Sequence, residues 1–232
     1  MSEQVRPEVL ISRLTSSNES WRVDAETRLV SLGDAAVPSL IGALQHAHPA
    51  VRIHAVHALS RIGNRLALPA MISALADTEN NSAGAIAAEK ALVSWGEDAK
   101  GALLKASLTG PAHVRARALR ALGKIGGDDL EPPLRALIAD PLPGVRAQAA
   151  AALAQLCGAR CVEAIRPILG DPDKWVRYAA AEALVQIGSA GGERVLQQAR
   201  EDSEEEGSYL RFWADDLLDQ IAELRRTGRA SA

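Results

Sequence analysis

The chain has 232 residues, of which 47% are hydrophobic, 24% are charged and 3% are aromatic. Its 26 lysine and arginine residues nearly balance 29 aspartate and glutamate residues, which gives a net charge of −3. The overall charge therefore indicates neither nucleic acid nor an anionic membrane as a partner. Aromatic residues are too few for the compact core of an enzyme of this length, whereas alanine-rich helix seams need fewer large side chains.

Compartment and membrane insertion can also be predicted from the composition. The chain contains two cysteines, and its first residues, MSEQVRPEV, lack the apolar run of a signal peptide. This combination is typical of a protein in a reducing, cytoplasmic setting. No run approaches the roughly 20 consecutive apolar residues that a membrane-spanning helix needs.

Helical spacing of apolar residues begins near the N-terminus. The pattern from Val5 to Leu14 fits one helix with Pro7 in its first turn, a position where proline is tolerated. We predict that residues 1–18 hold an N-terminal cap helix and that residues 19–200 hold helical repeats. The first predicted pairs are 21–32 with 36–45, and 51–62 with 67–75; Gly33 and Gly63 end their first helices.

The pattern loosens in the third pair and is regular again afterwards. Residues 78–84 replace the tight turn, but Leu92, Trp95 and Gly96 keep their places in the repeat. The later predicted pairs are 114–125 with 130–139, 145–156 with 161–169, and 175–187 with 192–200. Pro167 is expected to kink or shorten its helix.

The C-terminal part departs from the repeat. Residues 201–208 form an acidic loop, EDSEEEGS. Residues 209–226 are predicted as a C-terminal cap helix with apolar residues on one side and acidic residues on the other. Residues 227–232 are expected to be a disordered tail.

A Val-Arg pair recurs near the start of the first helices at a fixed interval. Arg115, Arg146 and Arg177 are separated by 146 − 115 = 31 and 177 − 146 = 31 residues. A constant period of this size is typical of stacked helix pairs, because one pair alone cannot bury its apolar face. We therefore predict an all-α solenoid of about six helix pairs, forming a single domain over residues 1–232.

The period near 31 and the recurring Val-Arg, Ala-Leu and Ile-Gly pattern resemble the short HEAT-like repeats of phycobilisome lyases and of many bacterial repeat proteins. The resemblance covers nearly the whole chain, although larger HEAT repeats run to about 40 residues. It implies that the second helix of each pair lines a concave side. Known members include partner-binding scaffolds and chromophore lyase subunits, so the fold alone does not decide the function.

An arginine recurs near the start of the first helices, six residues after a turn position. Such arginines could form a phosphate-binding ladder. We interpret them instead as structural, because each can hydrogen-bond the carbonyls and aspartate of a neighbouring turn. The set is Arg22, Arg52, Arg115, Arg146, Arg177 and Arg211.

Histidine, cysteine and tryptophan residues were weighed as ligand-binding groups. A weak candidate metal site is the histidine group His46, His48, His54 and His57. No His-Glu pairs of the iron-dependent hydroxylase branch appear, and we predict neither a metal nor a cofactor. Cys157 and Cys161 lack Cys-x-x-Cys spacing and are interpreted as packing residues. The tryptophans are expected to face the core: Trp21, Trp95, Trp175 and Trp213.

If second helices line the concave side, one position in each should point into the groove. These candidate partner-binding residues are apolar in the N-terminal half and become basic later: Ile11, Ile41, Ile72, Leu104, Arg135 and Arg166. An exposed apolar row bordered by charge is typical of a contact surface. Packing of the same side chains against adjacent helices is the alternative interpretation.

No catalytic arrangement of residues stands out. We therefore expect a non-catalytic scaffold or adaptor whose concave face binds a protein, for example through a helical segment of that partner. The alternative is a phycobilin lyase-type subunit that binds an open-chain tetrapyrrole and its acceptor protein. In that case Arg135 and Arg166 would hold propionates while Ile41 and Ile72 contact the rings. A HEAT-like DNA glycosylase is disfavoured because the groove row offers few cations for phosphates.

Overall fold

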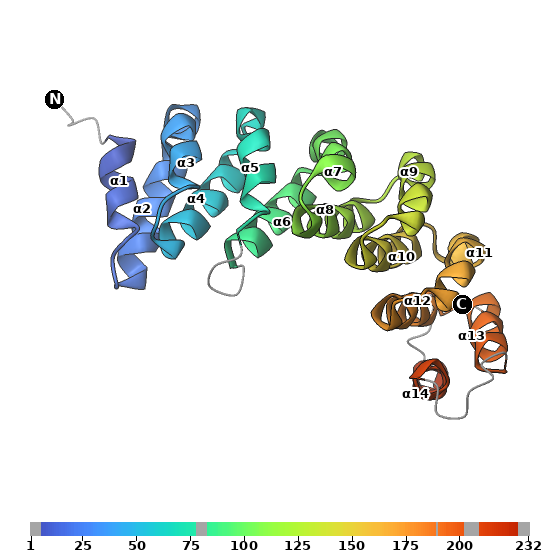
Figure 1. Cartoon of the computed structure of the whole chain (residues 1–232). Coiled ribbons are helices and arrows are strands. Elements are labelled where there is room, and N and C mark those ends of the chain that lie inside the picture. Colours follow the sequence, from blue (N-terminus) through green and yellow to red (C-terminus); the bar gives the residue numbers. More distant parts are fainter. Residues whose placement is uncertain (1–5, 78–82, 189, 202–208, 227–232) are drawn as a thin grey trace. The chain divides into compact units, whose positions relative to one another are not determined.

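The computed structural model describes residues 6–77, 83–188, 190–201 and 209–226, and these residues form helices joined by short turns (Figure 1). The chain divides into two compact units, Met1–Ala121 and Leu122–Ala232. The predicted all-α architecture of repeated helix pairs is confirmed. The predicted acidic loop and C-terminal tail lie outside the described residues, except for Glu201, which is the last residue of a helix and not part of a loop.

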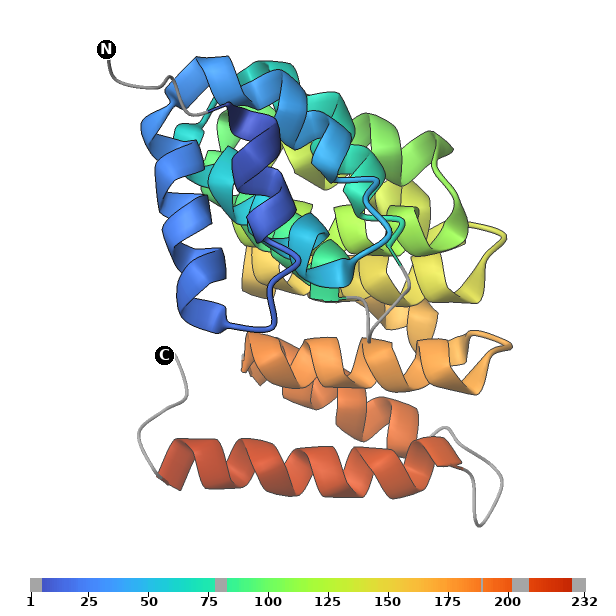
Figure 2. The same ribbon diagram turned by 90° about the vertical axis from the view of Figure 1, so that its left-hand side faces the viewer.

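The first unit is a two-layered stack of helices. Its first helices, α2, α4 and α6, form one layer, and α1, α3, α5 and α7 form the other (Figures 1 and 2). The elements in chain order are α1 (Pro7–Arg13), α2 (Glu19–Ser31), η1 (Gly33–Ala36), α3 (Val37–Ala43), α4 (Pro49–Ile62), η2 (Arg65–Ala67), α5 (Leu68–Ala74), α6 (Ala83–Trp95) and α7 (Glu97–Thr109). Helix α8 (Ala112–Ile125) contains the boundary between the units.

The second unit continues the alternation of long first helices and shorter second helices. After α8 its elements are η4 (Asp128–Leu130), α9 (Glu131–Ala136), η5 (Leu137–Ala139), α10 (Pro143–Cys157), η6 (Gly158–Cys161), α11 (Val162–Ile165), η7 (Arg166–Gly170), α12 (Lys174–Ile187), α13 (Ala190–Glu201) and α14 (Tyr209–Arg226). Helix α14 packs against both α12 and α13 (Figure 2). Its Leu217 is buried, whereas Asp215, Asp216 and Asp219 are exposed, as expected of an amphipathic cap.

Proline and glycine set the ends of the helices. Gly63 and Gly188 follow α4 and α12 with φ angles of +74° and +63°, which a residue without Cβ adopts at little cost. Helix α11 ends at Ile165, and the segment that contains Pro167 is a 3-10 helix. The expected shortening at Pro167 is confirmed, because proline cannot donate an intrahelical hydrogen bond.

Small residues allow the helices of the second unit to approach closely. The buried face of α10 includes Ala149, Ala150 and Ala152. A Cβ atom placed on Gly123 of α8 would lie 3.0 Å from the Cα atom of Ala152, so a larger residue there would force these helices apart. Alanine and glycine thus occupy seams that larger side chains fill in other folds, which explains the low aromatic content.

The recurring arginine fixes each first helix to the turn before it. Its guanidinium donates to a carbonyl six residues earlier in four repeats, between Arg22 and Ser16, Arg52 and His46, Arg146 and Asp140, and Arg177 and Asp171. Arg115 donates to Ser107 instead, at 2.9 Å. The structural interpretation of these arginines is confirmed, apart from Arg211, whose side chain lies outside the described residues.

Two of these arginines also bind the aspartate of the following turn. Arg146 Nε and Nη2 lie 2.7 Å and 2.8 Å from the Asp171 carboxylate oxygens, and both side chains are about nine-tenths buried. The same bidentate pairing joins Arg52 to Asp77 at 3.0 Å and 3.4 Å. Each pair therefore connects two successive turns through a single guanidinium.

Replacing Arg146 by methionine should destabilise the protein by about 3 kcal/mol, because the Asp171 carboxylate would remain buried without its cation. Chemical denaturation followed by circular dichroism measures this change. Arg166→Met is the control, since the Arg166–Glu163 pair is exposed and should contribute less than about 1 kcal/mol. Equal losses of stability in the two variants would contradict the structural role of Arg146.

The Arg146–Asp171 pair should also make stability depend on acid pH. The hydrogen bond from Arg146 holds the pKa of Asp171 below its ordinary value of 3.8. As the pH falls, the unfolded chain therefore takes up this proton first, so the stabilisation is complete above pH 3.8 and is lost as pH falls through the folded-state pKa. The stability difference between the wild type and Asp171→Asn should narrow accordingly in unfolding curves recorded from pH 7 to pH 3. A difference that stays constant over this range would contradict the prediction.

Candidate functional site

The predicted partner-binding residues of the first unit lie at equivalent places on its second helices. Ile11 on α1, Ile41 on α3, Ile72 on α5 and Leu104 on α7 are all half-buried. Each is followed by an exposed residue: Ser12, Gly42, Ser73 and Lys105. We call these eight residues the second-helix face. Each apolar side chain both packs against its neighbours and contributes to the surface, so the two interpretations of this row each hold in part.

A polar contact joins the first two helices of this layer. Ser39 Oγ on α3 donates to Glu8 Oε1 on α1 at 2.7 Å. This hydrogen bond lowers the pKa of Glu8, which therefore remains a carboxylate. A negative charge thus lies on the same two helices as Ile11 and Ile41.

The two predicted arginines belong to the second unit and are exposed. Arg135 Nη2 lies 2.8 Å from Glu131, and Arg166 Nε lies 3.5 Å from Glu163. Each pair is formed within one turn of its own segment, where solvent weakens the attraction. Such arginines can exchange an intramolecular carboxylate for one on a partner at little cost.

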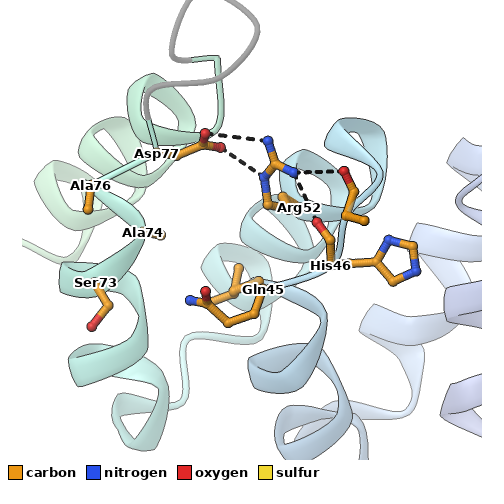
Figure 3. Close-up of a pocket in the computed structure, with 9 residues that line it drawn as sticks. Gln45, His46, Arg52, Ser73, Ala74, Ala76 and Asp77 are labelled. Carbon is orange, nitrogen blue, oxygen red and sulfur yellow. Dashed lines mark hydrogen bonds and ion pairs between the residues drawn. The ribbon is translucent and has the colours of Figure 1, made fainter.

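A pocket of about 350 Å³ lies between the C-terminal ends of α3 and α5 (Figure 3). Its lining includes Arg52, Asp77, Gln45 and Ser73. The Arg52 guanidinium is bound by the Asp77 carboxylate and by the backbone carbonyls of His46 and Ala47. Because this cation is already neutralised, the pocket offers no favourable place for a phosphate.

The histidines separate into two groups with different surroundings. His46 Nδ1 accepts a hydrogen bond from the His48 backbone, and His48 Nδ1 accepts one from the backbone of Ala50 at the start of α4. These two side chains cap the turn, a role that polar side chains commonly have before a helix. His54 and His57 point instead to Glu26 on α2.

Glu26 is the centre of a cluster of polar side chains between α2 and α4. Its Oε2 lies 2.7 Å from Nδ1 of His54 and 3.7 Å from Nδ1 of His57, while Oε1 lies 3.3 Å from Arg61 Nη1. Glu26 and His54 are largely buried, and His57 is half exposed. Burial raises the pKa of Glu26, but the hydrogen bond with His54 and the nearby His57 ring outweigh it and lower the pKa to about 2. Glu26 is thus a carboxylate at neutral pH.

Glu26 is not among the residues predicted from the sequence, although the repeat contains a signal for it. Glu26 lies 26 − 22 = 4 residues after Arg22, and Glu89 lies 89 − 85 = 4 residues after Ala85, the equivalent repeat position. Glu89 is buried and paired with Arg120 of the next first helix at 2.7 Å. A glutamate at this position therefore faces the following repeat. Aligning the repeats of the sequence places Glu26 and Glu89 at the same position, and this recurrence is the signal.

The predictions for the cysteines and tryptophans are confirmed only in part. Cys157 and Cys161 are buried, as expected of packing residues, but they also form a disulfide, which was not expected. Trp95 is buried, whereas Trp21 and Trp175 are 65% and 64% exposed, so the prediction that these two face the core is wrong. Trp175 precedes the buried repeat position Val176. Trp21 lies on α2, the first helix of its layer in the described part of the chain, where α4 packs against it. The side chain of Trp213 lies outside the described residues.

Comparison with protein families identifies the repeat. A sequence model of HEAT repeats matches residues 7–93, 101–160 and 131–215, which is most of the chain. No curated protein matches the chain. Within the described residues, no helix has the length and apolar character that crossing a membrane requires.

Several solved structures have a similar arrangement of helices. One chain in the structure of the complex of CpcE and CpcF of phycocyanin lyase from Nostoc sp. PCC7120 is 26% identical to this chain. The match covers 95% of this chain and 96% of that chain, with a TM-score of 0.41. Human deoxyhypusine hydroxylase is 20% identical, with 94% and 96% covered and a TM-score of 0.45. An archaeal HEAT-like repeats protein from Thermococcus onnurineus NA1 is 15% identical, with 96% and 99% covered and a TM-score of 0.47.

Proposed function

Because the chain belongs to the HEAT-repeat family, we propose that it is a non-catalytic scaffold that binds a protein partner on its second-helix face. The observation that carries this proposal is the repetition of one surface pattern on α1, α3, α5 and α7. Each helix presents a half-buried apolar side chain beside an exposed small or polar residue. A partner that covers this face would complete the burial of all four apolar side chains.

The spacing of the second helices suits a helical partner. Packed helices lie about 8 to 10 Å apart, while seven residues of an α-helix advance about 10.5 Å. A guest helix lying across the layer can therefore present one apolar residue to each repeat. Small neighbours such as Gly42 and Ser73 leave room for its backbone to approach.

Charge on the first unit favours a partner with a basic segment. Glu8 is a carboxylate on α1, beside the apolar row of the second-helix face. A basic segment of the partner beside α1 would match this charge. The tetrapyrrole alternative stays a prediction. Its ring contacts, Ile41 and Ile72, belong to the first unit, whereas the arginines that would hold its propionates, Arg135 and Arg166, belong to the second.

Substituting both Ile41 and Ile72 by aspartate should reduce binding of the partner at least about tenfold, because two buried apolar contacts are lost and two charges are desolvated. Affinity capture from the native host and quantitative mass spectrometry identify the partner, and calorimetry with the purified partner measures the change. Leu66→Asp is a matched control, because Leu66 is 77% exposed and lies on η2 outside the second-helix face.

Crosslinking and a folding control show whether the second-helix face is the binding surface. A photo-crosslinking residue at Ser73 should attach to the partner, whereas the same residue at Leu66 should not. Circular dichroism shows whether the doubly substituted chain is still folded. If that folded chain binds every captured protein as strongly as the wild type does, the second-helix face is not the binding surface.

A further inference from the structure

Three side chains at the junction of α2 and α4 can reach a single point. Glu26, His54 and His57 each offer one ligand atom, and these atoms all lie within 4.8 Å of one another. Glu26 comes from α2, and the two histidines lie three residues apart on α4, so that both rings are on one side of that helix. Two packed helices of the first unit thus hold the group in place.

We infer that Glu26, His54 and His57 form a binding site for a divalent transition-metal ion of the Zn²⁺ class. Two imidazoles and one carboxylate are ligands that suit Zn²⁺ and its neighbours, whereas Mg²⁺ and Ca²⁺ favour oxygen ligands throughout. The carboxylate supplies negative charge beside two uncharged ligands. This assignment goes beyond the scaffold function, and neither inference depends on the other.

Two of the three distances between ligand atoms require only small side-chain movements, and the ligand atoms of His54 and His57 lie within 4.8 Å of each other. Ligand bonds of about 2.1 Å in a tetrahedral site place the ligand atoms about 3.4 Å apart. The Glu26 Oε2 atom now lies 2.7 Å from His54 Nδ1 and 3.7 Å from His57 Nδ1. The first distance must lengthen by about 0.7 Å and the second must shorten by about 0.3 Å to reach this geometry. The ion would take the place of the hydrogen bond between His54 and Glu26.

Further charged groups lie beside the three ligands. The second ring nitrogen of His54, Nε2, lies 3.9 Å from Glu19 Oε1, which is too far for a hydrogen bond but on the side where a carboxylate commonly orients a ligating imidazole. Arg61 contacts Oε1 of Glu26 and leaves Oε2 directed to the histidines. Its side chain is 53% exposed, so water screens its charge from the ion. The half-exposed ring of His57 leaves room for water as a fourth ligand.

The equivalent position at another junction of the first unit shows that a metal ligand is not needed for packing. Glu89 has the same place in its repeat as Glu26, and Arg120 has the same place as His57, because 120 − 115 = 5 and 57 − 52 = 5. Glu89 and Arg120 form a bidentate ion pair, in which Arg120 Nε donates to Oε1 and Nη2 donates to Oε2. Arginine keeps its charge and has no lone pair for a metal, whereas neutral imidazole has one. The histidines therefore provide metal-binding nitrogen atoms, which the ion pair of Glu89 and Arg120 lacks.

Metal titration of the chelator-treated full chain tests this inference. Calorimetry with Zn²⁺ should give one ion bound per chain, and Co²⁺ should produce the visible absorption bands of a four-coordinate site. Zn²⁺ should raise the unfolding temperature because it binds the folded state. Mg²⁺ should neither bind stoichiometrically nor raise the unfolding temperature. An effect of Mg²⁺ equal to that of Zn²⁺ would overturn the assignment to the Zn²⁺ class.

Substitutions separate the metal site from a purely structural cluster. His57→Arg introduces the residue that occupies the equivalent repeat position, Arg120. It should therefore preserve folding while weakening Zn²⁺ binding more than about tenfold. Glu26→Gln should weaken binding to a similar extent. His113→Ala is the control, because His113 is an exposed histidine on α8. The inference is overturned if the wild type binds no stoichiometric Zn²⁺ at micromolar concentrations, or if His57→Arg and Glu26→Gln bind it as tightly as the wild type.

Discussion

The stacking of this protein depends on a guanidinium held near the start of its first helices. A helix that begins at a tight turn leaves backbone carbonyls of that turn without partners, and a buried carbonyl without a hydrogen bond is costly. Arg52 and Arg146 satisfy two such carbonyls each and also bind the aspartate of the next turn. One side chain therefore defines both the local turn and the distance to the following repeat.

A second set of contacts crosses from one first helix to the next and differs between repeats. Glu89 binds Arg120, whereas the equivalent Glu26 binds His54, His57 and Arg61. Both arrangements neutralise a largely buried carboxylate, so both are compatible with stacking. Only the arrangement around Glu26 also presents imidazole nitrogens. Repeats with one backbone geometry can thus carry different chemistry at the same position.

The second-helix face, which we propose as the binding surface, has a regular pattern. Ile11, Ile41, Ile72 and Leu104 occur once per repeat and are partly exposed, while the residues beside them are small or polar. A regular row of this kind on successive helices suits the extended partner that we propose. The Glu26 cluster lies on the first helices, in the other layer of the stack, and the two proposals therefore concern different layers of the first unit.

The sequence by itself determined the class of fold, the order of the helices and the structural role of the arginines. These features depend on local spacing: the period of 31 residues, the glycines after first helices, and an arginine six residues after its turn. The effect of Pro167 was predictable for the same reason, because proline acts within its own turn. The HEAT-repeat resemblance added the assignment of the two helix layers.

Contacts between repeats were decided only by the tertiary structure. Helical spacing placed Trp21 and Trp175 with the core-facing residues, but burial depends on whether a neighbouring helix covers that position, and both are exposed. Glu26 was overlooked because its partners lie 28 to 35 residues later in the chain. The disulfide of Cys157 and Cys161 is instead a local contact across four residues, and the conformation of the turn after α10 brings the two sulfur atoms together. A repeat sequence specifies which positions face the next repeat, while the side chains that meet there depend on how the helices pack.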